Sequence, residues 1–484
     1  MSELVLEKHD ELPKNWIKAK LNDLCELIGG GTPSRNNSEY FGGNIIWLTP
    51  TEIPKNTITR INDSREKITD LGLKKSSARI IPKESVLLTS RASIGYVAIA
   101  GDNVTTNQGF ASFICYKPLF NYYLAYWLWG NKKNIESEAT GTTFKEITKS
   151  KLREMIIPLP SLNEQKRIVT KIEELFSLIE STKQLLEKTA ILIKQSKRSF
   201  LKSAFEGNLT SKWREENKIL GISISDILEK NNSTSVNLES KCEELYSIPE
   251  SWSWVRVNQI CSKINDGTHF SPSNSIHGDI PYVTAKNIRP NKIDLTNVTY
   301  ISKKIHDDIY SRCNPEKGDI LYTKDGTVGY SVVNPFDFEF SLLSSVALLK
   351  PLKNIIDSYF LSHYLNSPVN FYRITGKMTG TALRRVILER IKEIPIPLAP
   401  LIEQKIIVSK IDEGLSIIEQ NENLVNLLLL QINYIKNSIL KQAFEGKLVP
   451  QDPNDEPAKI LLEKIKQEKQ KIISQTKREK KNDK

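Results

Sequence analysis

The sequence contains an internal duplication, and this limits the folds that the chain can adopt. Residues 157–209 match residues 396–448 without a gap, 239 positions further on, and about half of the paired residues are identical. A match of this quality indicates two copies of one structural unit. We therefore expect two similar halves rather than one continuous core, which also suits a chain of 484 residues.

Upstream of these segments the repeat continues more loosely. Leu12-Pro13-x-x-Trp16 corresponds to Ile248-Pro249-x-x-Trp252, and the offset between equivalent residues changes by a few positions along the chain. Such changes indicate short insertions, which usually fall in loops. Each half thus has a variable front part, here called head 1 (residues 1–155) and head 2 (residues 246–394), and a well-matched back part.

The heads are predicted to be α+β domains with curved sheets. Short β-type runs, such as 45–49, 85–89 and 111–116, are separated by Gly, Pro and Asn turns. Each head also contains one segment expected to be helical, Tyr122 to Lys133 in head 1 and Asp357 to Asn366 in head 2.

The back parts, 156–210 and 395–449, are predicted to be long helices, each with an apolar stripe at heptad spacing. Two related stripes in one chain favour a coiled coil between them; packing inside an ordinary helical domain is the alternative. Leu428 and Ile435 also fall on the second stripe. The predicted seam consists of Ile168, Ile172, Leu175, Ile179, Leu186, Ile193, Ile407, Ile411, Ile418, Val425, Ile432 and Ile439.

Three further features complete the predicted organisation. Gly207 and Gly446 lie where helix C-caps are expected. The polar stretch 211–245 reads as a linker between the halves, and 450–484 as a turn followed by a basic helix and tail. No apolar run is long enough for a membrane span and no secretory signal is visible, so a cytoplasmic protein is expected.

The composition and the motifs argue against an enzyme. The net charge of +11 permits a phosphate-bearing partner without requiring one. No Pro-Pro pair, P-loop, Cys-x-x-Cys or His-x-x-x-His motif is present, so no cofactor and no metal site are expected. Glu164-Gln165-Lys166 and Glu403-Gln404-Lys405 have a spacing found in some nucleases, but they occur at both helix starts and are interpreted as helix N-terminal structure.

In their order and duplication, these motifs resemble the specificity (S) subunit of type I restriction–modification systems. The resemblance covers nearly the whole chain: the two Pro-x-x-Trp openings, Gly29 to Ser34, the Pro-Leu…Glu-Gln-Lys helix starts, the Ala-Phe-Glu-Gly-x-Leu helix ends, and Leu448 to Pro457. Head 2 departs from the pattern, because Asn265 to Phe270 replaces the glycine-rich run. A different loop conformation is expected there.

The resemblance implies a non-catalytic subunit that recognises double-stranded DNA. Each head would be a target recognition domain for one half of an asymmetric bipartite site. The long helices would pair antiparallel, separate the heads, set the spacer and dock two modification (M) methyltransferase subunits; restriction (R) subunits would join for cleavage. A non-catalytic coiled-coil scaffold that binds protein partners is the alternative function.

Loop residues that could donate or accept hydrogen bonds are the candidate DNA contacts. Arg91 is predicted to bind a guanine through two hydrogen bonds, whereas Lys145, Arg384 and Arg385 are interpreted as phosphate contacts. The remaining candidates are Thr32, Ser34, Arg35, Thr89, Ser90, Asn287, Arg289, Thr323 and Lys324.

Overall fold

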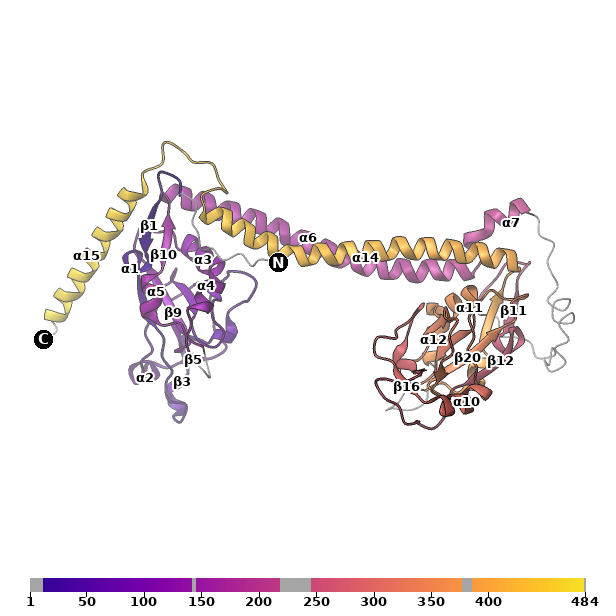
Figure 1. The fold of residues 1–484 in the computed structure, drawn as a ribbon. Helices are drawn as coiled ribbons and strands as arrows, with labels where there is room; N and C mark the ends of the chain where they lie inside the picture. The colour runs from indigo at the N-terminus through magenta and orange to yellow at the C-terminus, as the bar shows by residue number, and fades with distance from the viewer. Residues whose placement is uncertain (1–11, 142–144, 218–244, 377–384, 483–484) are drawn as a thin grey trace. The chain divides into compact units, whose positions relative to one another are not determined.

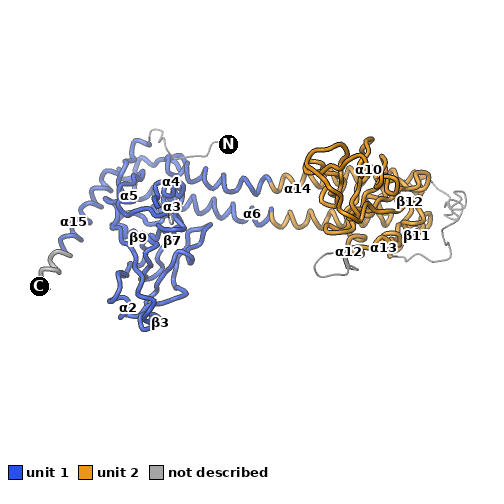
Figure 2. The backbone as a smooth tube through the Cα atoms, turned by 60° about the horizontal axis from the view of Figure 1, so that its bottom comes forward, with its two compact units in different colours: residues 1–186, 427–484 blue, residues 187–426 orange. Residues whose placement is uncertain are grey.

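The computed structural model describes residues 12–141, 145–217, 245–376 and 385–482. The chain forms two compact units (Figure 2). Unit 1 consists of Met1–Leu186 and Leu427–Lys484, and unit 2 consists of Glu187–Asn426. Each unit contains one head, part of the first long helix and part of the second. In the described part of the chain, no helix has the length and apolar character required to cross a membrane.

Head 1 contains a five-stranded sheet of order β2-β9-β6-β7-β4, a three-stranded sheet of order β5-β3-β8 and the pair β1-β10 (Figure 1). Its strands are β1 (Ile17–Lys20), β2 (Cys25–Gly29), β3 (Phe41–Leu48), β4 (Arg60–Ile61), β5 (Lys67–Ile68), β6 (Val86–Thr89), β7 (Val97–Ala100), β8 (Thr105–Thr106), β9 (Phe110–Cys115) and β10 (Ile156–Leu159). Its α-helices are α1 (Leu21–Leu24), α2 (Asp70–Lys74), α3 (Asn121–Gly130), α4 (Lys132–Ser137) and α5 (Lys149–Glu154).

Head 2 repeats this topology with sheets of order β12-β20-β17-β18 and β16-β13-β19 and the pairs β14-β15 and β11-β21. Its strands are β11 (Ser253–Arg256), β12 (Cys261–Asp266), β13 (Ile280–Val283), β14 (Ile288–Arg289), β15 (Lys292–Ile293), β16 (Thr299–Ile301), β17 (Ile320–Thr323), β18 (Ser331–Val333), β19 (Ser341–Leu342), β20 (Val346–Pro351) and β21 (Pro395–Leu398). Its helices are α9 (Val257–Ile260), α10 (Lys303–Arg312), α11 (Ser358–Leu365), α12 (Pro368–Gly376) and α13 (Leu388–Lys392). The predicted mixed fold with two sheet-containing halves is confirmed.

One apolar helix in each head connects the sheet to the long helices. Most of α3 is buried, and the Tyr123 ring lies 5.3 Å from the Phe444 ring. Its equivalent α11 packs against Phe205, whose ring centroid is 5.5 Å from Phe360 and 5.1 Å from Tyr364. The helix predicted for Tyr122 to Lys133 is in fact two helices, α3 and α4, separated at Asn131.

The long helices are α6 (Leu162–Phe205) and α14 (Leu401–Phe444), and they pack together in both units. In unit 1, Lys436 of α14 lies 5.6 Å from the Phe176 ring and 3.7 Å from Glu180 of α6. In unit 2, Gly414 of α14 contacts the ring of Phe200 of α6. The start of each helix thus lies beside the end of the other, which is an antiparallel arrangement.

The residues of the predicted seam lie on the inner faces of these helices. Ile168, Ile172, Ile407 and Ile411 are completely buried, and the other seam residues are buried or half-buried. Leu428 and Ile435 are 38% and 44% exposed, so their assignment to the stripe was wrong. They lie about one helical turn from Val425 and Ile432, which are buried.

A buried hydrogen bond joins the residue before the first strand of each head to the start of a long helix. The Trp16 indole donates to Glu164 at 3.0 Å, and the Trp252 indole donates to Glu403 at 2.9 Å. Gln404, the residue after Glu403, bonds back to the loop through Ala399 O at 2.7 Å. The repeated Glu-Gln pair is therefore a structural anchor that links residues about 150 positions apart.

The end of each long helix closes the anchor of the other half. Gly446, with φ of 71°, packs against the Pro13 ring, and Gly207, with φ of 79°, packs against Pro249. Both glycines adopt the left-handed conformation that the C-cap prediction requires. The opening Pro-x-x-Trp motif of one half thus contacts the closing glycine of the other.

Of the two segments that follow the long helices, the first differs from prediction and the second contains the predicted basic helix. The predicted linker begins with a helix, α7 (Ser211–Asn217), because Arg214 binds the buried carboxylate of Glu403; residues 218–244 of that linker lie outside the described chain. The predicted basic C-terminal helix is α15 (Ala458–Asn482), and its Leu461 and Ile465 are buried in the core of head 1.

The two anchors differ in charge, so we predict unequal responses to the same substitution. Glu403→Gln leaves Arg214, whose side chain is only 17% exposed, without its carboxylate, and should cost unit 2 about 3 kcal/mol. Glu164→Gln should destabilise unit 1 much less. Burial raises the pKa of this carboxyl, so its charged form is less favoured, and the nearby Arg167 keeps its own partner, Asp455, after the substitution. Hydrogen exchange of residues 12–24 and 246–260 measures each effect; equal losses in both units would contradict this assignment.

Substitution of Gly446 tests the contact between the two halves. Gly446→Ala places a Cβ against Pro13 on a backbone conformation that side chains rarely adopt. The left-handed backbone alone should lower the free energy of unfolding of unit 1 by about 1 kcal/mol, and the contact with Pro13 should lower it further. Gly42→Ala is the matched control, because Gly42 has φ of 80° but no atom lies within 4 Å of the place that its Cβ would take. Equal destabilisation by both substitutions would show that the Pro13 contact is unimportant.

Candidate nucleic-acid interface

The tight turn that follows β6 in head 1, and the equivalent turn that follows β17 in head 2, carry several of the predicted contacts. Thr89 begins the turn in head 1 and Thr323 begins it in head 2; both are fully buried. Each hydroxyl oxygen accepts a hydrogen bond at 2.9 Å from the backbone N–H seven residues later. These threonines hold the turn together, so they are framework residues rather than candidate DNA contacts.

The second residue of the turn is also buried in both heads. Ser90 is 4% exposed, and Lys324 is 2% exposed with its Nζ 3.1 Å from the carboxylate of Asp266. Burial of a lysine requires such a partner, because an unpaired ammonium group away from water is very unfavourable. Ser90 and Lys324 therefore belong to the framework of the heads, contrary to the sequence-based assignment.

The third residue of the turn is exposed in head 1 and bridges to a second segment. Arg91 forms an isolated β-bridge with Glu146, and its Nε lies 3.7 Å from the Glu146 carboxylate. In head 2 the equivalent bridge joins Asp325 and Arg385, with Arg385 Nε 3.1 Å from Asp325. Both predicted arginines thus belong to equivalent bridges, Arg91 on the turn and Arg385 on the second segment.

The glycine-rich loop of head 1 has mainly a packing role. Gly30 faces the backbone of β8 so closely that no side chain fits, and Trp47 donates to Gly31 O at 3.0 Å. Thr32 at the end of the run is half-buried and bonded to Gln108, whereas Ser34 is exposed. Gly267 makes the equivalent close approach in head 2, against Leu342 O.

Arg35 is exposed but already bound within head 1. Its guanidinium donates to the carboxylate of Glu66, one bond being 2.8 Å long. It also lies over the rings of Phe41 and Trp47, at 4.5 Å and 5.1 Å from their centroids. These contacts orient Arg35 and reduce its availability for a ligand.

The remaining candidates separate into buried and exposed groups. Asn287 is buried, and its amide bonds to Thr284 N and Asp294 O, so it is a turn residue rather than a contact. Arg289 and Lys145 are exposed. Arg384 lies outside the described residues.

The structure thus leaves a small set of exposed polar candidates in each head. In the described part of the chain, no group of three or more His, Cys, Asp or Glu side chains is arranged to hold a metal ion. The exposed candidates are Ser34, Arg35, Arg91 and Lys145 in head 1, and Arg289 and Arg385 in head 2.

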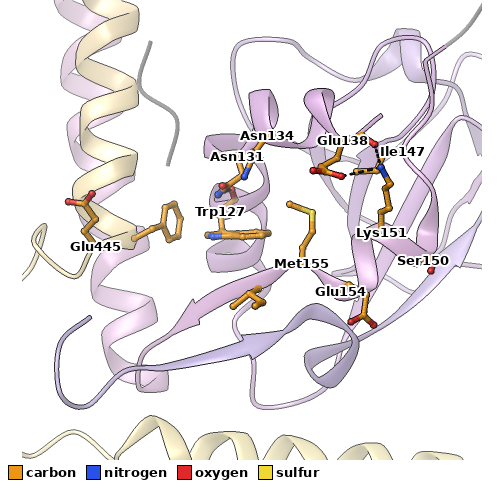
Figure 3. Close-up of a pocket in the computed structure, with 12 residues that line it drawn as sticks. Trp127, Asn131, Asn134, Glu138, Ile147, Ser150, Lys151, Glu154, Met155 and Glu445 are labelled. Atoms are coloured by element: carbon orange, nitrogen blue, oxygen red, sulfur yellow. Dashed lines mark hydrogen bonds and ion pairs between the residues drawn. The ribbon is translucent and has the colours of Figure 1, made fainter. Parts of the chain in front are cut away.

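A pocket of about 520 Å³ in unit 1 is separate from these residues (Figure 3). It lies among α3, α4, α5, β10 and the end of α14, and none of the candidate contacts lines it. Its carboxylates are paired with lysines: Glu138 with Lys151 at 3.1 Å and Glu154 with Lys20 at 2.6 Å. The pocket therefore shows no unpaired charge among these groups that would select a ligand.

Sequence reasoning missed the carboxylate partners of the exposed Arg91 and the buried Lys324. Glu146 and Asp266 were not considered as partners, because each ion pair joins segments that are more than 50 residues apart in the chain. The duplication contained a signal for Glu146, since this residue aligns with Arg385 at the same offset as the long helices.

Comparison with known proteins identifies the family. A family model described as "Type I restriction modification DNA specificity domain" matches residues 13–189 and 249–442. The chain is 30% identical over 406 residues to the type I restriction enzyme MjaIX specificity subunit of Methanocaldococcus jannaschii, covering 81% of this chain and 86% of that protein. It is 28% identical over 473 residues to the EcoDI specificity subunit of Escherichia coli, covering 95% and 96% of the two chains.

The fold is also similar to that of a solved structure. The HsdS subunit from Thermoanaerobacter tengcongensis superposes with a TM-score of 0.61 at 19% identity, covering 92% of this chain and all of that one. Both segments matched by the family model include one head and part of a long helix. The chain therefore belongs to the type I restriction–modification DNA specificity family and is the DNA specificity subunit of such a system.

Proposed function

We propose that each head reads one half of an asymmetric, bipartite DNA target, and that α6 and α14 set the spacer and dock two M subunits. The subunit itself catalyses no step; methylation belongs to the M subunits, and cleavage to R subunits that join the complex. The observation that carries this proposal is the repetition of one topology with different exposed side chains.

The framework positions of the heads are equivalent, whereas their exposed residues are not. The buried turn threonines Thr89 and Thr323 make the same hydrogen bond in both heads. Two positions after the threonine, head 1 has the exposed Arg91 and head 2 has the half-buried Asp325. Since base-edge contacts specify sequence and phosphate contacts only position the protein, different exposed side chains on one framework favour different half-sites.

The exposed surface of the long helices supports the docking proposal. Leu178 and Leu185 of α6 are both 63% exposed, and their equivalents Ile417 and Leu424 of α14 are 54% and 53% exposed. Residues seven apart lie on one face of a helix. Each unit therefore has an exposed apolar pair at the same place in the repeat, which fits two copies of one partner. Exposed apolar surface of this kind usually marks an interface.

Replacing one head by the other tests modular recognition. In this variant, residues 25–147 of head 1 are replaced by residues 261–386 of head 2, and Trp16, α5 and β10 are kept. The incoming α11 then packs against Phe444 and Leu440, which are equivalent to its normal neighbours Phe205 and Leu201. The assembled complex should then methylate an inverted repeat of the head 2 half-site with the spacer unchanged, because both heads carry the same loops.

Mapping of methylated adenines in DNA from cells carrying this chain and its partners measures the outcome, with the unaltered chain as control. Binding of the purified complexes at 50 and 200 mM salt should weaken about equally, because most affinity comes from phosphate contacts. Retention of the original asymmetric target, or loss of both half-sites from a folded complex, would contradict modular reading; binding that salt does not affect would favour the protein scaffold.

Charge substitutions on the exposed helix faces test the docking of M subunits. Leu178→Glu with Leu185→Glu should remove one of two M subunits, and Ile417→Glu with Leu424→Glu should remove the other, because each pair introduces charge into an apolar contact. Native mass spectrometry of complexes with purified M subunits measures the stoichiometry. Gln184→Glu, at an exposed position on the same helix, is the matched control. Two bound M subunits in a variant with all four substitutions would exclude this surface.

A further inference from the structure

The bridge between the turn and the following segment has the same backbone geometry in both heads. Ile147 N donates to Ser90 O at 3.0 Å in head 1, and Val386 N donates to Lys324 O at 2.8 Å in head 2. Ile147 and Val386 are 2% and 1% exposed, so each buries the inner side of its bridge. The two bridges are therefore equivalent positions of one framework.

The charges on the two bridges are reversed. In head 1 the turn supplies the cation, Arg91, and the second segment supplies the anion, Glu146. In head 2 the turn supplies the anion, Asp325, and the second segment supplies the cation, Arg385. Both heads thus have an arginine paired with a carboxylate at this bridge, but the arginine comes from the turn in head 1 and from the second segment in head 2.

Stability does not explain these pairs well. The side chains of Arg91 and Glu146 are 44% and 46% exposed, and those of Arg385 and Asp325 are 54% and 28% exposed. Ion pairs with this exposure add little to folding stability, because water screens them and ordering long side chains is entropically unfavourable. A function outside the folded chain accounts better for a charged pair at the same place in both heads.

We propose that these two ion pairs determine base specificity: Arg91 and Arg385 each read a guanine, and Glu146 and Asp325 are positioning residues that orient them. This inference rests on the proposed function. Arg385 thereby becomes a base contact rather than a phosphate contact. The reversed polarity places the guanidinium on opposite sides of equivalent bridges, so the two heads address different positions of their half-sites.

The chemistry of the side chains supports these roles. A guanidinium carries five N–H donors in a fixed planar arrangement, and in both pairs the carboxylate lies next to Nε. Two parallel donors match O6 and N7 of guanine in the major groove. A carboxylate at one edge limits the rotation of the guanidinium, and pre-orientation of this kind lowers the entropic cost of binding.

Arginine-to-lysine substitutions distinguish base reading from phosphate binding. Arg91→Lys and Arg385→Lys keep the positive charge but remove the planar pair of donors. In assembled S–M complexes, each variant should lose discrimination about tenfold at a single base pair of one half-site, with an unchanged dependence of binding on salt. Methylation of a library with randomised half-sites, read by sequencing, measures discrimination at every position. A uniform loss over all sequences, or no loss, would overturn the proposal.

Substitutions of the carboxylates test the positioning role. Glu146→Gln should relax the same base pair as Arg91→Lys, and Asp325→Asn the same base pair as Arg385→Lys, each by several-fold. Glu154→Gln is the control in head 1, because Glu154 forms an exposed ion pair with Lys20 elsewhere in the head and should leave discrimination unchanged. Relaxation at a different position, or an equal effect of the control, would contradict the assignment.

The charge-exchange variant Arg91→Asp with Glu146→Arg gives head 1 the polarity of head 2. It should move the preferred base pair within the half-site of head 1 and leave the other half-site intact. Thermal unfolding of the variants at Arg91, Glu146 and Arg385 should match that of the unaltered chain, since these side chains are 44% to 54% exposed. Asp325 is half-buried, so the effect of Asp325→Asn on discrimination is measured in complexes whose folding has been checked. The head replacement described above separates the two proposals: if it changes one half-site while these variants change none, only the present inference fails.

Discussion

The structure depends on a hydrogen bond from a buried indole to a buried carboxylate, made once in each half. Trp16 and Trp252 lie directly before the first strand of each head, and Glu164 and Glu403 lie in the first turn of each long helix. Because the carboxylates are buried, they need these donors, and the glycines that end the long helices pack against the same anchors. One interaction thereby joins a head, the helix that follows it and the helix of the other half.

This arrangement separates the residues that build the heads from those that vary between them. The strand order, the turn threonines and the buried helix beside the long helices are common to both heads, while the exposed ends of the bridges carry opposite charges. A buried position is constrained by close packing and by complete hydrogen bonding. An exposed position is not, so recognition can change there without disturbing the fold.

The sequence predicted the α+β class, the duplication and the pairing of the long helices, because each produces a pattern in the order of residues. It was less successful for individual contacts. Lys324 and Asn287 have polar side chains typical of nucleic-acid contacts, yet both are buried and bound to Asp266 and to backbone groups. Polarity alone does not reveal whether a side chain faces solvent, since that depends on partners distant in the chain.

The sequence by itself determined that two related halves exist, where their long helices begin and end, and most of the residues that form the apolar stripes. Only the tertiary structure decided which polar side chains are exposed, which partners orient them, and that Arg91 and Arg385 occupy equivalent bridges with reversed charge. The physical reason is that helix periodicity and capping are local properties of the chain, whereas the burial and pairing of a charge depend on segments that folding brings together.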